Sequence, residues 1–468
     1  MNFISLDFII FLLVTLLGFY SLKDKWRTPF LLAASYFFYG YWSIPYLFLL
    51  IFTMVVDFYF AIKIEEAKTQ KLRKSFLIFS LFLNLGILFV FKYFNFFVDI
   101  LHETVGMQIK ESHLILPFAI SFYTFHAMSY VIDVYRHQIK AERNFVPYSA
   151  YVMFFPQLVA GPIARAQHLL HQFREKKYFK TEQWLSAFWY IACGYIMKMV
   201  LADNIGPTVD YYYYETGPEK TPFNIVQATY LFAFQIYFDF AGYTSIAIGI
   251  AKLFDFELVK NFERPYIAQS MTEFWRRWHI SLSTWLRDYL YVSLGGNRHG
   301  KLKMYRNLML TMLLGGIWHG ANLTFLLWGF LHGLYLVIEK VIKSFAFTSS
   351  VSNYIPKFVR IFIVFNLVSL AWIPFRCKTI AESIERMQLF GHWFIHPLSY
   401  ISFSDIQRKL WILVIGWLVF EWITEKWDLH QRFIKSNLVV KYCSAYAAIV
   451  IIVLFAQTNP EAFIYFQF

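Results

Sequence analysis

Three histidines lie in apolar stretches of the sequence: His279, His319 and His332. An ionisable side chain at membrane depth is costly, and by default it marks a path or a reaction. A neutral imidazole is the side chain best suited to accept a proton near neutral pH. For any one of the three taken alone, the alternative is a hydrogen-bonded structural residue, because polar groups also hold membrane helices together.

His319 has neighbours that fit such a reaction. It lies in "LLGGIWHGANLTFLLWG", with Trp318 as an apolar wall. Asn322, three residues on, is a potential hydrogen-bond donor to a carbonyl group. Removing the proton of a hydroxyl while its attack on a carbonyl develops an oxyanion requires both functions, a base and a donor.

The helix that carries His319 is expected to be broken. As one helix, residues 306–343 would be about 55 Å long at about 1.5 Å per residue, which is more than a membrane requires. The adjacent glycines Gly315 and Gly316 are the expected place for the break. His319 would then lie just beyond it, deep in the protein.

A second polar cluster reads "FWRRWHISLSTWLRDYLY". As one helix it would carry a stripe of aromatic side chains, with His279 beside the stripe and pointing inward. One interpretation is an anchor at the cytoplasmic membrane surface. The other is that its arginines, with one that follows, hold the phosphates of a cytosolic donor. These arginines are Arg276, Arg277, Arg287 and Arg298.

Asp239 lies mid-span in "FQIYFDFAGYTSIAIG". An intramembrane aspartate can act as a proton relay, but pairing with an arginine or a histidine is favoured. We therefore assign Asp239 to the polar lining of the site, together with Asn322.

The composition indicates which kind of protein must position these residues. Of 468 residues, 58% are hydrophobic and 22% aromatic, which is too apolar for a soluble globular protein of this length. The net charge of +13 is attributed to basic cytoplasmic loops rather than to nucleic-acid binding. Three scattered cysteines predict neither a metal site nor a disulfide framework.

Apolar segments long enough to cross, or nearly cross, a core of about 30 Å recur along the chain, which predicts an all-α polytopic membrane protein. The expected spans lie near Phe3–Ser21, Phe30–Ile44, Tyr46–Ile62, Phe76–Ile100, Leu116–Val134, Trp184–Ala202, Phe223–Ala251, Phe358–Phe375, Leu410–Trp422 and Tyr442–Ala456. Residues 148–166 are interrupted by prolines and a glycine, and we expect a re-entrant segment there. Broken backbone is tolerated at membrane depth only where protein or a water-filled cavity satisfies it.

Basic segments fall on one side of this alternation, which assigns that side to the cytoplasm. They are residues 22–27, 67–74, 135–143, 173–180 and 252–303. Counting crossings then places both termini outside the cytoplasm. Arg376 and Lys378 are an exception, because they fall on the outer side.

Four motifs together resemble the membrane-bound O-acyltransferase family: "FWRRWHISLSTWLRDYLYVSLGGNRHG", "LLGGIWHGANLTFLLWGFLHGLYL", "LPFAISFYTFHAMSYVIDVYR" and "FFPQLVAGPIARA". Within the family they resemble the bacterial branch that O-acetylates alginate and peptidoglycan. The resemblance implies one integral membrane domain over residues 1–468, with a motif-bearing catalytic core at 116–375. It also implies about 10–12 transmembrane helices plus re-entrant segments around a central funnel.

The resemblance assigns roles as well. The catalytic histidine of the family matches His319, and its second functional position matches His279. Acetyl-CoA, entering from the cytoplasm, is the implied donor substrate, with no bound cofactor or metal, and the bacterial cytoplasmic membrane is the implied location. Two positions depart from the family pattern, with Ser245 replacing a common aspartate and His126 a common glutamine.

The tail at residues 457–468 ends in "FIYFQF". It looks like the end of the small membrane peptide of teichoic-acid D-alanylation, whose tyrosine is thought to carry the acyl group. The matching residue is Tyr465, and the crossing count places it outside the cytoplasm. The alternative is an aromatic anchor at the membrane interface.

The family also implies an extracytoplasmic SGNH-type transferase as partner and a polysaccharide as final acceptor, with membrane lipid around the chain. Two alternatives stay open at this point. One is a family member that acylates a lipid or a protein. The other is a transporter or channel, which is disfavoured because no internal repeat is visible.

Overall fold

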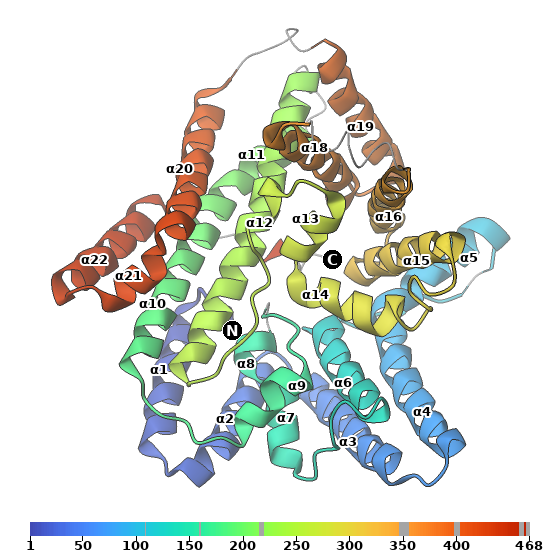
Figure 1. Ribbon diagram of the computed structural model, residues 1–468, viewed down its shortest axis with the longest axis vertical. Coiled ribbons are helices and arrows are strands. Elements are labelled where there is room, and N and C mark those ends of the chain that lie inside the picture. The colour runs from blue at the N-terminus through green and yellow to red at the C-terminus, as the bar shows by residue number, and fades with distance from the viewer. Residues whose placement is uncertain are drawn as a thin grey trace. The chain divides into compact units, whose positions relative to one another are not determined.

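A computed structural model describes residues 1–107, 109–158, 161–214, 220–345, 355–396, 403–457 and 463–464. All regular structure in these residues is helical (Figure 1), as the apolar segments predicted. The chain divides into two compact units, Met1–Ile191 with Ile246–Val259 (unit 1) and Ala192–Ser245 with Lys260–Phe468 (unit 2). The single domain expected over 1–468 stays a prediction.

Unit 1 holds the N-terminal helices. They are α1 (Leu6–Ser21), α2 (Asp24–Gly40), α3 (Ile44–Glu66), α4 (Gln70–Leu88), the π-helical η1 (Phe89–Tyr93), α5 (Phe94–Val105), α6 (Ile120–Tyr135), α7 (Phe145–Met153), α8 (Phe155–Leu158), α9 (Ala166–Leu169), the 3-10 helix η2 (Leu170–Phe173) and most of α10 (Thr181–Tyr195). Side chains cap several of them, as at Ser5, Thr69 and Asn144. The broken segment at residues 148–166 is confirmed as broken, because α7 and α8 are short and separate.

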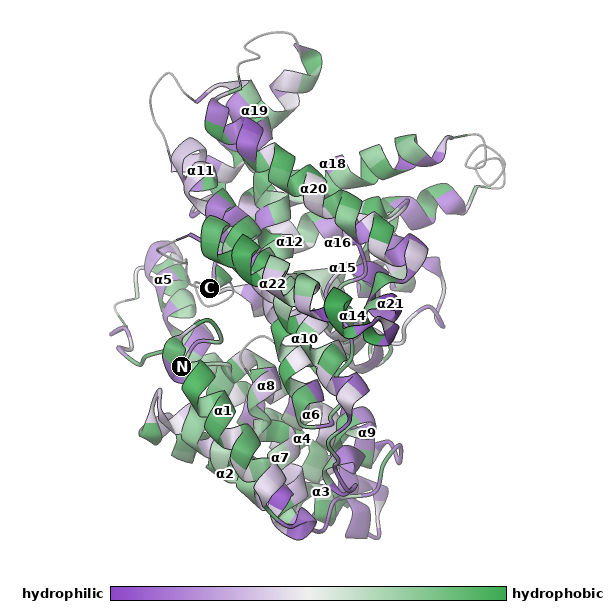
Figure 2. Cartoon of the chain, turned by 90° about the vertical axis from the view of Figure 1, so that its left-hand side faces the viewer, coloured by the Kyte–Doolittle hydropathy of each residue, from purple (hydrophilic) through white to green (hydrophobic). Residues whose placement is uncertain are grey.

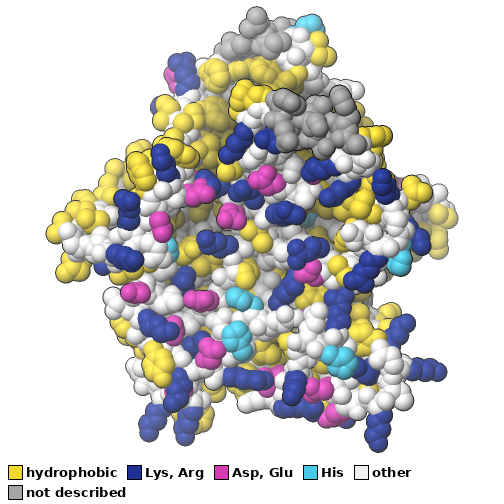
Figure 3. All heavy atoms as spheres, in the orientation of Figure 1, with side chains coloured by type: hydrophobic (Ala, Val, Ile, Leu, Met, Phe, Trp, Pro, Cys, Tyr) yellow, Lys and Arg dark blue, Asp and Glu magenta, His cyan; other side chains and the backbone are white. Residues whose placement is uncertain are grey.

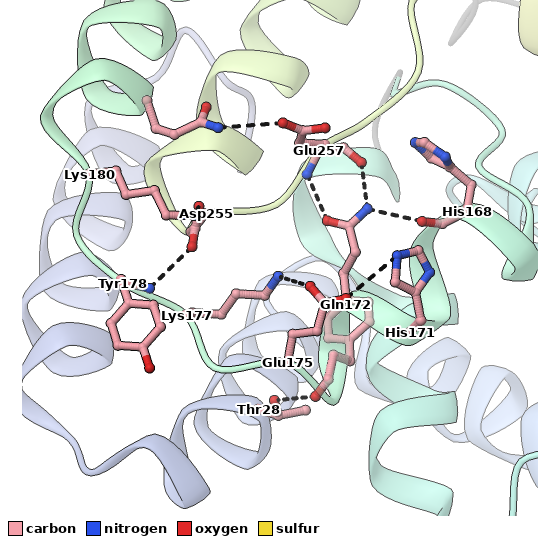
Figure 4. Close-up of polar contacts among 12 residues, drawn as sticks. Thr28, His168, His171, Gln172, Glu175, Lys177, Tyr178, Lys180, Asp255 and Glu257 are labelled. Atoms are coloured by element: carbon pink, nitrogen blue, oxygen red, sulfur yellow. Dashed lines mark hydrogen bonds and ion pairs between the residues drawn. The ribbon is translucent and has the colours of Figure 1, made fainter.

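A polar network closes one end of unit 1 (Figure 4). Asp255 accepts hydrogen bonds from the main-chain N–H of Tyr178 (3.2 Å) and from Lys180 (2.8 Å). Gln172 exchanges two hydrogen bonds with the main chain of Glu257, at 2.9 and 3.0 Å. These bonds tie the basic loop at residues 173–180 to the segment that follows α12.

Unit 2 holds the motifs singled out above. Its elements are the π-helical η3 (Ile196–Ala202), α11 (Asp203–Tyr214), the first part of α12 (Pro222–Leu253), the 3-10 helix η4 (Pro265–Ile267), α13 (Met271–Arg277), α14 (Ile280–Trp285), the π-helical η5 (Leu286–Tyr291), α15 (Lys301–His319), α16 (Leu323–Lys343), α18 (Lys357–Arg376), α19 (Ile380–Ile395), α20 (Asp405–Trp427), α21 (Leu429–Lys435) and α22 (Leu438–Phe455). Its core is built from aromatic residues of α12, α13, α16 and α18.

Within the described ranges, seven helices are long and apolar enough to cross a membrane. They are Ile44–Glu66, Gln70–Val105, Thr181–Tyr214, Pro222–Leu253, Leu323–Lys343, Lys357–Arg376 and Leu438–Phe455. The first predicted span is a shorter apolar helix, Leu6–Ser21. Figure 2 shows hydrophobic residues along the flanks of α1 and α22, as expected of helices that face lipid. The chain is therefore a multi-pass membrane protein.

Candidate active site

His319 is the last residue of α15, and only 5% of it is exposed. Its ring lies among aromatic side chains, with ring centroids 4.9 Å from Trp318, 4.9 Å from Trp328 and 5.3 Å from Phe375. A helix end places the imidazole at a point where the main chain changes direction, inside an apolar wall. Such a wall excludes the water that would otherwise hydrolyse a reactive acyl donor.

The helix break is not where the sequence predicted. α15 continues through Gly315 and Gly316, and the chain breaks only after His319. The reason is close packing between α15 and α16. A Cβ on Gly316 would lie 2.3 Å from the carbonyl oxygen of Phe325, and one on Gly329 would lie 2.4 Å from that of Met312. The glycines let the two helices approach and so hold His319 against α16.

His279 also lies at a break, between α13 and α14. The expectation of one amphipathic helix is wrong here, because His279 has a φ of +41° and ends the helical run. Asn261 holds the break, accepting hydrogen bonds from the main-chain N–H groups of Ile280 (2.9 Å, to its carbonyl) and Ser281 (3.2 Å, to its side chain). A left-handed conformation is uncommon for a residue with a side chain, and such strain is concentrated at functional sites.

The His279 ring points inward, as expected, and is fully buried. It packs edge-on against Phe240, with ring centroids 4.6 Å apart. Burial lowers the pKa of the His279 imidazole to about 3, because desolvation disfavours the charged form. The residue is therefore a neutral hydrogen-bonding group, suited to position or polarise a carbonyl.

The structure brings His279 and His319 to the same aromatic side chain. The ring centroid of Trp318 lies 6.3 Å from that of His279 and 4.9 Å from that of His319. Two imidazoles beside one indole can supply both functions that an acyl transfer needs. One can act as the general base and the other as the hydrogen-bond donor.

Comparison with known proteins shows the family of the chain. Residues 138–374 match the model of the membrane-bound O-acyltransferase family. The probable alginate O-acetylase of Pseudomonas aeruginosa is 39% identical over 428 residues, which cover 90% of this chain and 80% of that protein. The chain belongs to the membrane-bound O-acyltransferase family.

Two further relatives of this acyltransferase are named for other activities. The peptidoglycan O-acetyltransferase of Helicobacter pylori is 36% identical over 80% of this chain and 76% of its own length. The teichoic acid D-alanyltransferase of Streptococcus thermophilus is 30% identical over 55% of this chain and 67% of its own length. The O-acetylating relatives thus share more of the chain than the D-alanylating one.

Asn322 has a capping role in this acyltransferase. Its side-chain oxygen accepts a hydrogen bond from the main-chain N–H of Thr324 (2.9 Å), which caps α16. Its side-chain nitrogen donates to the carbonyl oxygen of Lys378 (3.0 Å). Both ends of the amide are in use, so the predicted role as a donor to a thioester carbonyl stays a prediction without geometric support.

The four arginines predicted to bind phosphate are not brought to one point by any contact among the described residues. Arg277 pairs with Glu273 (2.9 Å) and Arg287 with the adjacent Asp288 (2.6 Å), while Arg276 and Arg298 are exposed. Figure 3 shows Lys and Arg side chains over the part of the face occupied by α13 to α15. The basic surface is present, and binding of a donor phosphate by these arginines stays a prediction.

His332 is fully buried on α16, beside Trp328 (4.8 Å between ring centroids) and Trp275 (5.0 Å). Neither ring nitrogen of His332 has a hydrogen-bond partner in the described part of the chain. Buried polar atoms of this kind are generally satisfied by ordered water. Its ring continues the aromatic wall of His319 through Trp328.

The partner of Asp239 is a lysine, which the sequence interpretation did not consider. Lys198 lies 2.7 Å from Asp239 and 2.6 Å from Asp203, and all three side chains are buried. The signal was present in "YIMKMV", because a lysine within an apolar segment needs a partner as much as an aspartate does. Tyr465 lies outside the described residues.

Proposed function

We propose that this acyltransferase takes an acetyl group from cytosolic acetyl-CoA and passes it across the bacterial cytoplasmic membrane for O-acetylation of an exported polysaccharide such as alginate or peptidoglycan. The observation that carries the proposal is the buried His319 in its aromatic wall, sharing Trp318 with His279. The alginate and peptidoglycan O-acetylating relatives, similar over 80–90% of this chain, support the acceptor class.

In the proposed reaction His319 accepts the proton of the acceptor hydroxyl as its oxygen attacks the thioester carbonyl. The carbonyl oxygen becomes an oxyanion, which neutral His279 stabilises as a hydrogen-bond donor. Collapse breaks the carbon–sulfur bond, and His319 returns the proton to the departing thiolate. The products are an acetyl ester and free CoA, and no other reactant is needed.

The acceptor hydroxyl in this proposal belongs to Tyr465, on the outer side of the membrane, or to a bound partner protein. An SGNH-type transferase outside the cytoplasm would then move the acetyl group from the tyrosine ester to the polymer. Mass spectrometry of C-terminal peptides after incubation with acetyl-CoA tests the relay. A Tyr465→Phe variant that still yields an acetylated tail peptide contradicts it.

The proposal as a whole is tested by deleting the gene and measuring ester-linked acetate on the surface polysaccharides. Loss of acetate that is restored by the wild-type gene, but not by one carrying His319→Ala, is the expected result. Unchanged acetate on every polysaccharide, with an acylated lipid or protein missing instead, would favour the alternative acceptor classes.

A further inference from the structure

The buried ions of unit 2 form a compact cluster. Nζ of Lys198 lies 2.6 Å from Oδ1 of Asp203 and 2.7 Å from Oδ1 of Asp239, and each side chain is at most 3% exposed. Removing charges from water is expensive, and a buried ion pair rarely adds net stability. A cluster of this kind is better explained by what it holds in place.

The local backbone is built to bring these ions together. Lys198 lies in η3, a π-helical segment, and π-helical turns occur often at functional sites. α12 approaches η3 closely at Gly242, where a Cβ would lie 2.9 Å from the carbonyl oxygen of Gly194 and 3.1 Å from the main-chain nitrogen of Lys198. This approach places Asp239, one helical turn earlier on α12, within reach of the lysine.

The cluster also holds a distant part of the chain. Oδ2 of Asp239 accepts a 2.7 Å hydrogen bond from the main-chain N–H of Ile464. Phe463 and Ile464 are buried, with exposed fractions of 0% and 5%. The ring of Phe463 packs against Tyr243 (4.5 Å between ring centroids) and Phe240 (5.6 Å). The tail therefore returns into the interior of unit 2 after α22.

The start of the tail is fastened to the same elements. The main-chain N–H of Gln457 donates to the carbonyl oxygen of Met199 in η3 (3.3 Å). The side chain of Asn204 donates to the carbonyl oxygen of Phe455, at the end of α22 (2.8 Å). The structure thus attaches the chain at Phe455 and Gln457 as well as at Ile464.

The buried end of the tail lies next to the candidate active site. The ring of Phe240 contacts both the ring of Phe463 (5.6 Å between ring centroids) and the ring of His279 (4.6 Å). Phe240 therefore connects Phe463 of the tail to the strained histidine.

We propose that Lys198, Asp203 and Asp239 form a clamp that positions Phe463 and Ile464 of the C-terminal tail as a fixed wall of the acyl-transfer site. The inference rests on the proposed function, because the clamp delivers the tail to the site where the acetyl group is transferred. The three residues are positioning residues, which act through Phe463 and Ile464.

The clamp is tested first by the accessibility of the tail. In a background with Cys193→Ala, Cys377→Ala and Cys443→Ala, an added Ile464→Cys keeps the main-chain N–H that Asp239 binds. We expect a polar maleimide to label this thiol at least tenfold faster when Asp239→Asn is also present. The reason is that an asparagine amide has only one acceptor oxygen. When that oxygen accepts from the Lys198 ammonium, the amide nitrogen faces the main-chain N–H of Ile464, and two donors cannot form a hydrogen bond. An unchanged labelling rate overturns the clamp.

Asp57→Asn is the matched control for labelling. Asp57 is an equally buried carboxylate in unit 1, where it accepts hydrogen bonds from Ser80 (2.5 Å) and Asn84 (2.9 Å). We expect it to leave the labelling rate at position 464 unchanged. Phe463→Ala, which removes the ring contact and keeps every charge, tests the same attachment if Asp239→Asn does not fold. It too is expected to raise the rate at least tenfold.

The role in transfer is tested by acetyl-CoA turnover in proteoliposomes. We expect Asp239→Asn to lower kcat at least tenfold while the KM for acetyl-CoA stays within about twofold, because the donor does not contact the clamp. Unchanged or faster turnover in Asp239→Asn overturns the proposal. The tail would then be a structural element or would block the site. Failure of the proposed function looks different, since wild-type turnover would then be absent or independent of His319.

Discussion

His279 and His319 pack against the same indole, that of Trp318, with ring centroid distances of 6.3 and 4.9 Å. Each histidine lies at the end of a helical run, so the main chain fixes the direction of each ring. The site is thus built from two helix breaks and one aromatic side chain. The expectations below follow from this construction.

His319→Ala is expected to lower acetyl-CoA turnover in proteoliposomes by about 10²–10⁴-fold, the usual contribution of a general base. Thermal melting in detergent checks that the variant folds, because the ring packs against Trp328 of α16 and Phe375 of α18. His168→Ala, which removes an exposed histidine of unit 1, is the control. Turnover within threefold of wild type in His319→Ala removes the base from the mechanism.

His279 is expected to remain neutral across the assay range, since its pKa of about 3 means that protonation begins only in strong acid. The acid limb of the pH–rate profile should therefore keep its midpoint in His279→Asn, although the rate falls. Asparagine tolerates a positive φ, whereas a β-branched residue does not. His279→Val should accordingly melt at a lower temperature than His279→Asn. A midpoint that moves with the asparagine variant contradicts this assignment.

Gly316→Ala is expected to destabilise the protein by about 1–3 kcal/mol, as overpacking generally does. The added methyl group would lie 2.3 Å from the carbonyl oxygen of Phe325. Gly416→Ala on α20 is the control, because nothing lies within 4 Å of its Cβ position. Thermal melting in detergent measures both. Equal melting temperatures for the two variants would show that α15 and α16 are not in close contact there.

Asn322→Ala is expected to cost about 1 kcal/mol through loss of the cap of α16, while turnover falls less than tenfold. The reason is that both ends of the amide are engaged with the main chain. Asn322→Asp keeps the capping acceptor and should restore most of the stability. If Asn322→Ala folds like the wild type and yet loses a hundredfold or more in turnover, the side chain acts on the carbonyl after all.

The helical class and the burial of His279 and His319 could be predicted, because they depend on composition and on the cost of ionisable groups in lipid. The positions of the helix breaks could not. Gly315 and Gly316 are weak helix formers. The sequence cannot show that a second helix packs on this part of α15, and that packing stabilises a continuous helix. Nothing in "RRWHISL" predicts a left-handed conformation at His279, because neither a glycine nor a proline lies in this stretch.

Pairings across the chain could be predicted only in part, because the buried Lys198 signalled the need for a partner but not which one. Asp239 was expected to find an arginine or a histidine, and it binds Lys198 and the main chain of Ile464 instead. Sequence spacing carries no information on contacts between residues more than 200 positions apart. The tail could be singled out by its motif, but its burial follows only from the three-dimensional packing of Phe463.

The apolar character of the spanning helices runs opposite to their depth in the protein. Of the seven candidate spans among the described residues, α22 is the most apolar and none of its window is buried, whereas α12 is the least apolar and nearly all of its window is buried. An aspartate near a helix centre opposes entry from the translocon by about 2.5–3.5 kcal/mol. We therefore expect α12 to integrate poorly during synthesis until later helices emerge from the ribosome, whereas α22 partitions into lipid unaided. Integration of α12 would then depend on helices that are synthesised after it, whereas integration of α22 would not.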